Sequence, residues 1–132
     1  MHSVRLFDSM RHRLATACLV VPLFGCTVVT PEPLPPYALS DNDTMIVLRG
    51  IYSAVKDLDE PSLRNLKAAR SNSGDVYVCG WVSSRTTKGY RTEQAFIGTL
   101  SAGQFSAERI AKDNYSTGEI LTKCQERGLS IS

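Results

Sequence analysis

Apolar residues recur at helical spacing before residue 58, at strand spacing from residue 59 to 111, and at helical spacing again near the end. The first helical stripe follows Ser40, which fits an N-cap because Asp43 comes three residues later, as in a capping box. Pro61 disfavours a helical conformation at the residue before it, so this helix is expected to end at about residue 57 or 58. Its predicted core face holds Val47, Leu48, Ile51, Tyr52 and Val55.

The densest β-forming run is residues 76–84, which contains the single Trp of the chain. Both of its alternating faces are apolar, which predicts an interior strand with packed material on each side. Residues 91–100 and 104–111 are expected to form two further strands, each after turn-forming residues. Residues 59–70 fit either a helix or a strand. The turn-forming segment 71–75 favours a strand there, because it leads directly into the run that begins at residue 76.

A second helical pattern begins near residue 116, where Ser116 or Thr117 is the predicted cap. Gly128 is expected to end this helix, because glycine readily adopts the backbone conformation that follows a helix. The predicted fold class is α+β: a small antiparallel β-meander of three to four strands, packed with an N-terminal and a C-terminal helix. The inner face of the second helix is predicted to hold Ile120, Leu121 and Cys124.

The first 25 residues are predicted to be an export signal. Arg11 and Arg13 precede an apolar run of about eleven residues. This run is well short of the ~20 residues needed to span a bilayer. Either Met1 or Met10 can be the start of the signal. The alternatives to a cleaved signal are a buried helix and an uncleaved anchor.

The sequence Leu23-Phe24-Gly25-Cys26 resembles the lipobox of bacterial lipoproteins. The resemblance implies cleavage before Cys26, a diacylglycerol on its thiol and an acyl chain on its new amine. Several acyl chains give stable membrane anchoring where one is marginal. Thr27 follows the cysteine, whereas an Asp at this position would resemble the inner-membrane retention signal of enterobacteria. The expected location is therefore the outer membrane, facing the periplasm.

Residues 26–39 are predicted to be the lipidated cysteine and a tether, and residues 40–132 a small periplasmic domain. Four prolines lie within residues 30–36. Proline lacks the backbone N–H and fixes φ, so the segment favours an extended polyproline II conformation. A spacer is the predicted role, and a proline-rich ligand for another protein is the alternative.

A second resemblance covers about residues 45–100. The matching residues are Val78-Cys79-Gly80-Trp81-Val82, Gly89-Tyr90 and Phe96. They are similar to the VCGxVNAKNxxGGYxGxxxF core of a family of small uncharacterised exported proteins of proteobacteria. The Asn-Ala-Lys-Asn stretch of that core is replaced here by Ser83-Ser84-Arg85-Thr86, and Lys88 replaces one of the paired glycines. The resemblance implies a β-meander flanked by helices and implies no activity.

The four cysteines separate by predicted role. Cys18 lies in the export signal and Cys26 is the lipid acceptor, which leaves Cys79 and Cys124 in the domain. An even pair in an oxidising compartment predicts a disulfide. Such a bridge would tie the central strand to the last helix. The alternative is two free buried thiols.

Charge and histidine content exclude several classes of function. The formal net charge of +2 comes from the first 25 residues, which hold three Arg and one Asp. The remaining twelve basic and twelve acidic residues show no basic excess, so no nucleic-acid partner is expected. His2 and His12 both precede Cys26, so the predicted mature chain has no histidine for a Ser-His-Asp triad, a Cys-His pair or a His-ligated zinc. No catalytic residue, metal or cofactor is expected.

The predicted loop between the second and third strands is hydroxyl-rich and basic. Arg85, Thr86, Lys88 and Tyr90 are its candidate contact residues for an anionic glycan or phosphate, and a plain solvated hairpin loop is the alternative. Two other groups of residues could have either a functional or a purely structural role. An aromatic recognition patch is weighed against core packing for Trp81, Phe96 and Tyr90. A catalytic carboxylate pair is weighed against a solvated helix end for Asp57, Asp59 and Glu60.

Two functions fit these observations. The first is a membrane-anchored envelope lipoprotein that acts as a non-enzymatic interaction or structural module. Its expected partners are the membrane, through the lipid anchor, and an envelope protein or peptidoglycan. The second is a small envelope enzyme, or an inhibitor of a cell-wall hydrolase.

Overall fold

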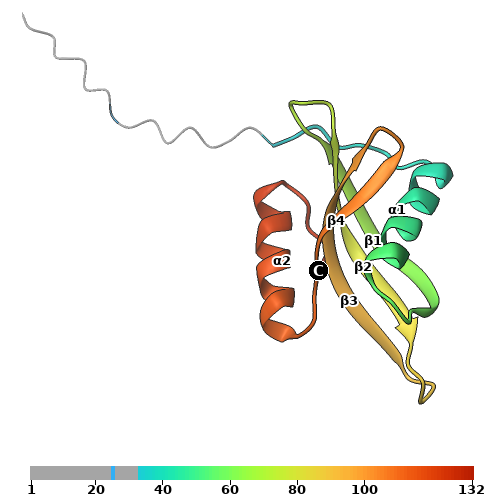
Figure 1. The fold of residues 1–132 in the computed structure, drawn as a ribbon. Coiled ribbons are helices and arrows are strands. Elements are labelled where there is room, and N and C mark those ends of the chain that lie inside the picture. Colours follow the sequence, from blue (N-terminus) through green and yellow to red (C-terminus); the bar gives the residue numbers. More distant parts are fainter. Residues whose placement is uncertain (1–24, 26–32) are drawn as a thin grey trace, which may run out of the picture. The chain divides into compact units, whose positions relative to one another are not determined.

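The computed structural model describes Gly25 and residues 33–132. Most of the predicted export signal, the predicted lipid acceptor Cys26 and the first part of the predicted tether therefore lie outside the described residues. The described domain contains one helix, a four-stranded sheet and a second helix, which confirms the predicted α+β fold (Figure 1). In chain order the elements are α1 (Asp41–Ala54), β1 (Asp59–Arg70), β2 (Val76–Arg85), β3 (Arg91–Ser101), β4 (Gln104–Ile110) and α2 (Asn114–Glu126).

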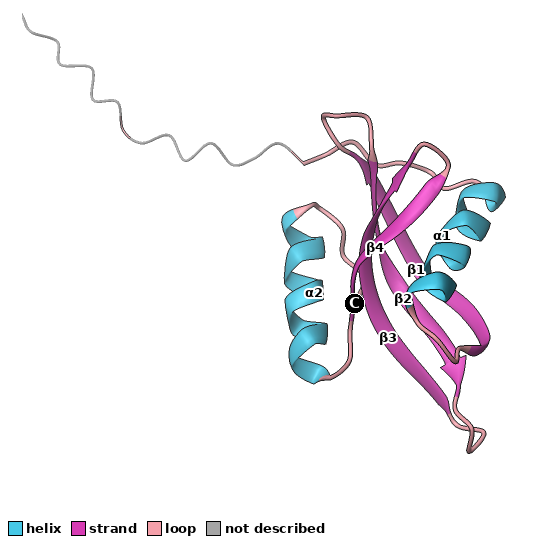
Figure 2. Cartoon of the chain, in the orientation of Figure 1, coloured by secondary structure: helices cyan, strands magenta, loops and turns pink. Residues whose placement is uncertain are grey.

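The sheet is an antiparallel meander in which neighbouring strands follow one another along the chain, in the order β1-β2-β3-β4. The ladder between β2 and β3 is unbroken from Val76↔Leu100 to Arg85↔Arg91. The register of β1 against β2 shifts twice, and β4 is the shortest strand. Residues 59–70 are thus a strand, as the turn signal after them predicted. The two helices lie on opposite faces of the sheet (Figure 2).

Alternation along β2 divides the interior into two cores, one on each face of the sheet. The α1 core contains Val76, Val78 and Val82 of β2, and the α2 core contains Cys79 with half-buried Tyr77 and Trp81. The prediction of packed material on both faces of this strand is therefore confirmed. The other large buried members are Val47, Ile51, Leu58, Phe96, Leu100 and Phe105 in the α1 core, and Ile97, Ile120, Cys124, Leu129 and Ile131 in the α2 core.

Both helix starts depend on a reciprocal cap. The Ser40 side chain accepts a hydrogen bond from the Asp43 backbone N–H at 3.0 Å, and the Asp43 side chain accepts one from the Ser40 backbone N–H at 3.0 Å. The capping box predicted for α1 is confirmed. In α2 the cap is Asp113, whereas the sequence predicted Ser116 or Thr117. Ser116 instead occupies the third helical position and exchanges hydrogen bonds with Asp113 at 2.7 and 3.1 Å.

The predicted end of α1 at residue 57 or 58 is wrong, because the helix ends at Ala54. Val55 has an extended backbone, and Asp57 has a φ of 70°, which takes the chain out of the helical direction. Buried Leu58 then packs into the α1 core and leads the chain into β1. The end of α2 agrees with the prediction, since Gly128 has a φ of 77° just beyond the cap residue Arg127.

Candidate functional site

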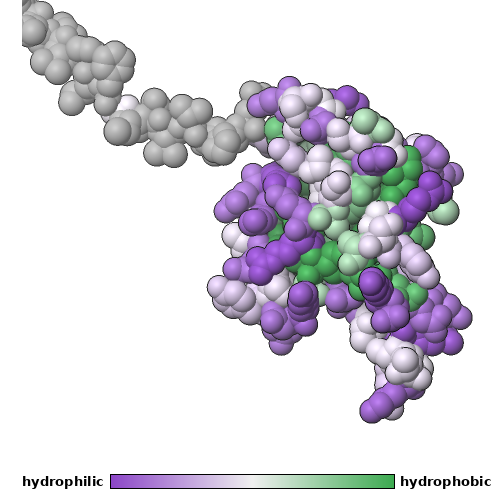
Figure 3. Space-filling view, viewed as in Figure 1, coloured by the Kyte–Doolittle hydropathy of each residue, from purple (hydrophilic) through white to green (hydrophobic). Residues whose placement is uncertain are grey.

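The β2–β3 hairpin extends beyond β4, while β1 stays paired with β2 as far as Asp59↔Arg85. The last pair between β3 and β4 joins Phe96 to Ile110, whereas the β2–β3 ladder continues to Arg85 and Arg91. This is five residues further, or about 17 Å. The turn is closed by hydrogen bonds from the Thr86 N–H to the Tyr90 carbonyl at 2.7 Å and from the Gly89 N–H to the Thr86 carbonyl at 2.9 Å. We call residues 83–93 the hairpin end. In the space-filling view it projects from the domain and is mainly hydrophilic (Figure 3).

The hairpin end carries a network of exposed charges. Arg85 and Arg91, which pair across the two strands, share the carboxylate of Glu60 at 3.4 and 4.0 Å. Glu93 binds Arg64 of β1 at 2.6 Å. Exposed ion pairs of this kind contribute about 0–1 kcal/mol each, so they orient side chains more than they stabilise the fold. Asp59 is the cross-strand partner of Arg85, so with Lys88 included four basic groups face three carboxylates, which leaves the region one net positive charge.

Three of the four predicted contact residues lie together on the surface of the hairpin end. Arg85 and Lys88 are exposed, and 72% of the Tyr90 side chain is accessible. Thr86 is half-buried and has a structural role, because its hydroxyl accepts a hydrogen bond from the Tyr90 backbone N–H at 3.2 Å and so stabilises the turn. Within the described residues, Lys88 pairs with no carboxylate. The hairpin end can therefore offer two cations and a phenol ring to a partner.

Trp81, Phe96 and Tyr90 do not come together in an aromatic patch at the surface. Phe96 is fully buried in the α1 core, against the edge of the Phe105 ring at a centroid separation of 6.0 Å. Trp81 lies on the opposite face, where its indole N–H donates to the Ile131 carbonyl at 2.6 Å. Only Tyr90 is available at the surface.

The Asp57, Asp59 and Glu60 group is exposed to solvent. Its one described pairing is the interaction of Glu60 with the arginines of the hairpin end. The group therefore adds its charges to the surface around the loop between α1 and β1.

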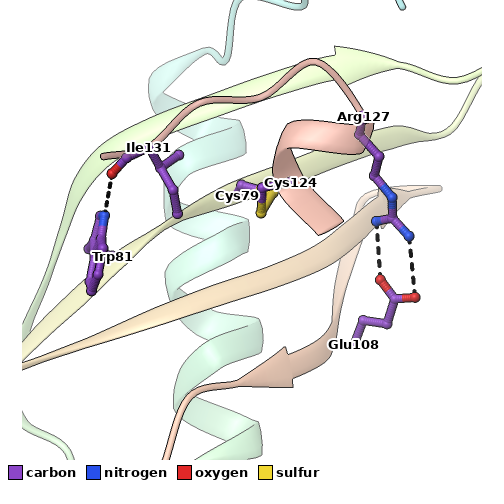
Figure 4. The surroundings of a disulfide bond; sticks show 6 residues. All are labelled: Cys79, Trp81, Glu108, Cys124, Arg127 and Ile131. Carbon is purple, nitrogen blue, oxygen red and sulfur yellow. Dashed lines mark hydrogen bonds and ion pairs between the residues drawn. A yellow bond between two sulfur atoms is a disulfide. The ribbon is translucent and has the colours of Figure 1, made fainter. Parts of the chain in front are cut away.

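Cys79 and Cys124 form the predicted disulfide, which joins β2 to α2 (Figure 4). Both cysteines are fully buried, and their Cα atoms are 6.2 Å apart. The bridge closes a loop with a sequence separation of 45, for which the chain-entropy model gives about 4 kcal/mol of stabilisation. Arg127 lies near the bridge, over the Tyr77 ring at 4.1 Å and against the Glu108 carboxylate at 3.1 Å. The cysteine pair is a structural element of the α2 core.

The described part of the predicted tether, residues 33–39, lies along the sheet, and we call it the docked segment. The Tyr37 N–H donates to the Ala68 carbonyl and the Arg70 N–H donates to the Pro35 carbonyl, both at 2.9 Å. The Arg70 guanidinium lies over the Tyr37 ring at 5.1 Å. Leu34 packs against the α2 core, while Tyr37 and Leu39 pack against the α1 core. The docked segment thus covers the last residues of the outer edge of β1, where backbone groups would otherwise be unpaired.

Two carboxyl groups in the described residues have pKa values below the ordinary value for Asp, and both belong to helix caps. The hydrogen bond from the Ser40 backbone N–H lowers the pKa of Asp43 below its ordinary value. The hydrogen bond from the Ser116 backbone N–H lowers the pKa of Asp113 in the same way. Each bond stabilises the ionised carboxylate. These shifts are therefore consequences of helix capping.

Two absences hold for Gly25 and residues 33–132. Neither α1 nor α2 is long and apolar enough to cross a membrane. Within the same residues, no three His, Cys, Asp or Glu side chains come together in a way that could hold a metal ion.

No protein-family model, curated protein or solved structure matches the chain. The resemblances to bacterial lipoproteins and to the exported proteobacterial family therefore stay predictions.

The sequence did not predict the docked segment. Its prolines indicated an extended chain, which is correct for the backbone, but its partner strand lies about thirty residues later. Tyr37 and Leu39 were the available signal. Two large apolar residues within a proline-rich spacer indicate that this part of the chain packs against the domain.

Proposed function

We propose that this chain is a lipoprotein of the bacterial outer membrane, anchored through Cys26, whose domain is a non-enzymatic interaction module facing the periplasm. The lipobox-like Leu23-Phe24-Gly25-Cys26 sequence supports the anchor. The buried Cys79–Cys124 disulfide supports an oxidising compartment, since such bridges are rare in the cytosol.

The position of the docked segment is the observation that carries the interaction role. Pro36 pairs with Ala69, which pairs with Tyr77 at the start of β2, whereas the hairpin end begins at the far end of β2 (Figure 1). Tyr77 and Arg85, the last residue of β2, are eight residues apart along the strand, or about 27 Å. Only residues 27–32 separate Cys26 from the docked segment, and six residues in a polyproline II conformation would span about 19 Å. An anchor at Cys26 would hold the domain close to the membrane by one end and present the hairpin end away from it.

The chemistry of the hairpin end supports contact with an anionic partner. Lys88 and Tyr90 are exposed, and Asp59, Glu60 and Glu93 together leave one positive charge of the region uncompensated. A charged surface of this kind favours association through electrostatic complementarity.

Lipid labelling in bacterial cells tests the anchor. The wild-type chain and the Cys18→Ser variant should take up labelled palmitate and fractionate with membranes. The Cys26→Ser variant should take up none and leave the membrane fraction. Labelling of Cys26→Ser at the wild-type level would contradict the proposal, and so would its retention in membranes. Cys18→Ser is the matched control, because Cys18 is the neighbouring cysteine that the lipobox does not use.

A further inference from the structure

A shallow groove of about 580 Å³ follows the outer side of α2 and is bounded on one side by Arg109 of β4. It lies apart from the hairpin end and from the disulfide. Tyr115, Gly118 and Lys123 line it along the helix. Grooves with an apolar wall and a few polar groups at the rim are where proteins bind small ligands and short polymer segments.

Tyr115 supplies the apolar wall. Tyr115 is 76% exposed, more than Tyr90, Tyr52 or Met45, the other exposed large apolar residues of the described domain. Gly118 lies one turn further along α2, and a Cβ added there would meet no atom within 4 Å. The space beside the ring is therefore open. An exposed phenol ring beside open space can stack on the apolar C–H face of a sugar ring, while its hydroxyl stays in water.

The charges around the groove indicate what a ligand should carry. Arg109 and Glu119 form an ion pair, so their charges compensate each other. Lys123, one turn after Glu119, pairs with no carboxylate in the described residues. The groove therefore has one uncompensated positive charge at the end away from Asn114, whose side-chain amide can both donate and accept hydrogen bonds. A ligand that matches these groups has a pyranose ring, hydrogen-bonding substituents and a carboxylate.

We infer that this groove binds a carboxylate-bearing amino-sugar polymer, the chemistry of bacterial peptidoglycan. The inference rests on the proposed function, because an envelope location is what would bring the chain to this polymer. It assigns the glycan to Tyr115 and Lys123 and leaves the hairpin end to other contacts.

Co-sedimentation with purified, protein-free peptidoglycan tests this site. The full chain should be kept in a zwitterionic detergent, because detergents with sugar headgroups would compete for the groove. A second probe is chitotetraose, a neutral amino-sugar oligomer without carboxylates. Wild-type protein should bind both probes, and peptidoglycan more tightly.

Two substitutions separate stacking from charge. Tyr115→Ala should weaken binding of both probes about tenfold, because it removes the stacking surface. Lys123→Gln should weaken binding of peptidoglycan about threefold and leave binding of chitotetraose unchanged, because only the first probe carries carboxylates. Tyr52→Ala and Lys56→Gln, at exposed positions on or next to α1, are the matched controls and should bind as wild type does. Thermal unfolding should give the same midpoint for Tyr115→Ala and Tyr52→Ala.

Three results would overturn the groove assignment. The first is a failure of wild-type protein to sediment with peptidoglycan. The second is wild-type binding by Tyr115→Ala. The third is loss of binding in Tyr90→Ala but not in Tyr115→Ala, which would move the glycan contact to the hairpin end. None of these results affects the lipid labelling of Cys26. The labelling experiment and the sedimentation experiment therefore test the anchor and the groove independently.

Discussion

The two faces of the sheet are packed by different means. The α1 core contains large side chains, with Phe96 and Phe105 in edge contact and Val47 and Ile51 of α1 packed against the sheet. The α2 core contains Ile97, Ile120, Leu129 and Ile131, but also three buried alanines, Ala69, Ala95 and Ala111, and the Cys79–Cys124 bridge. Small side chains bury less apolar surface, so we expect noncovalent packing to hold α2 less firmly than α1. The difference indicates that α1 depends on packing alone, whereas α2 depends on packing together with a covalent link.

The largest expected effect comes from removing the covalent link. The Cys79→Ala/Cys124→Ala variant should lose at least about 4 kcal/mol of unfolding free energy, because the unfolded chain regains the entropy of the closed loop. Urea unfolding measures the loss. Hydrogen exchange locates it: amides of α2 should lose protection while those of α1 keep more of theirs. Equal loss of protection in both helices would contradict the difference between the two faces.

The next largest effect should come from the α1 core. Phe96→Ala should cost between about 3 and 4 kcal/mol, because Phe96 is fully buried and its removal leaves a cavity beside Phe105. Urea unfolding measures this cost as well. The neighbouring Ile97 points to the other face, and Ile97→Val should cost only about 1 kcal/mol. A cost for Phe96→Ala no greater than that of Ile97→Val would mean that the α1 core can collapse around the loss.

A matched pair of glycines distinguishes how closely each helix approaches the sheet. A Cβ added at Gly50 of α1 would lie 2.5 Å from the Phe105 carbonyl oxygen, whereas one added at Gly118 of α2 would meet nothing within 4 Å. Gly50→Ala should therefore destabilise the protein by about 1 kcal/mol or more, since the clash outweighs the gain in helix propensity.

Gly118→Ala should have the opposite sign and stabilise the protein by about 0.5–1 kcal/mol, because it gains helix propensity without a clash. Thermal unfolding measures both changes: the midpoint should fall for Gly50→Ala and rise for Gly118→Ala. Midpoints that move in the same direction would contradict the close packing of α1 and the open outer side of α2.

The smallest expected effect is on the pH dependence of stability, and it should be similar for α1 and α2. Asp43 and Asp113 have lowered pKa values in the folded protein, so each contributes stability that is present above the ordinary pKa near 3.8. That contribution should be lost as the pH falls through the lower folded value. Unfolding midpoints between pH 6 and pH 3 should therefore fall less steeply for Asp43→Asn and Asp113→Asn than for wild type. A steeper fall in either variant would contradict the capping origin of these shifts.

Local patterns predicted the parts of the fold that local chemistry decides. The alternation of Val76, Val78 and Val82 with Tyr77 and Cys79 predicted an interior strand between two cores, and the cap at Ser40 was correct. The strand and the cap depend on residue identity and short spacing alone. The disulfide joins residues 45 apart and was predicted by counting the cysteines that follow the predicted export signal.

Features that depend on distant contacts were missed. The docked segment is held by Ala68 and Arg70, about thirty residues away, which no local pattern reveals. The cap of α2 was placed three residues late, because Asp113 and Ser116 are both good cap residues and only their exchanged hydrogen bonds show which is first. The turn between β2 and β3 lies where the sequence predicted it. Phe96 is buried and Trp81 is half-buried in the cores, so Tyr90 is the one exposed aromatic residue of the three.

The central claim is that the hairpin end contacts a partner, whereas the exposed side of α1 does not. Photo-crosslinking in living cells, with p-benzoylphenylalanine in place of Tyr90, tests it most directly. Tyr52 on α1 is the matched control position, since 56% of its side chain is exposed, against 72% for Tyr90. A discrete crosslinked product from position 90 and none from position 52 is the predicted result. Products of equal yield from both positions, or none from position 90, would contradict an interaction role for the hairpin end.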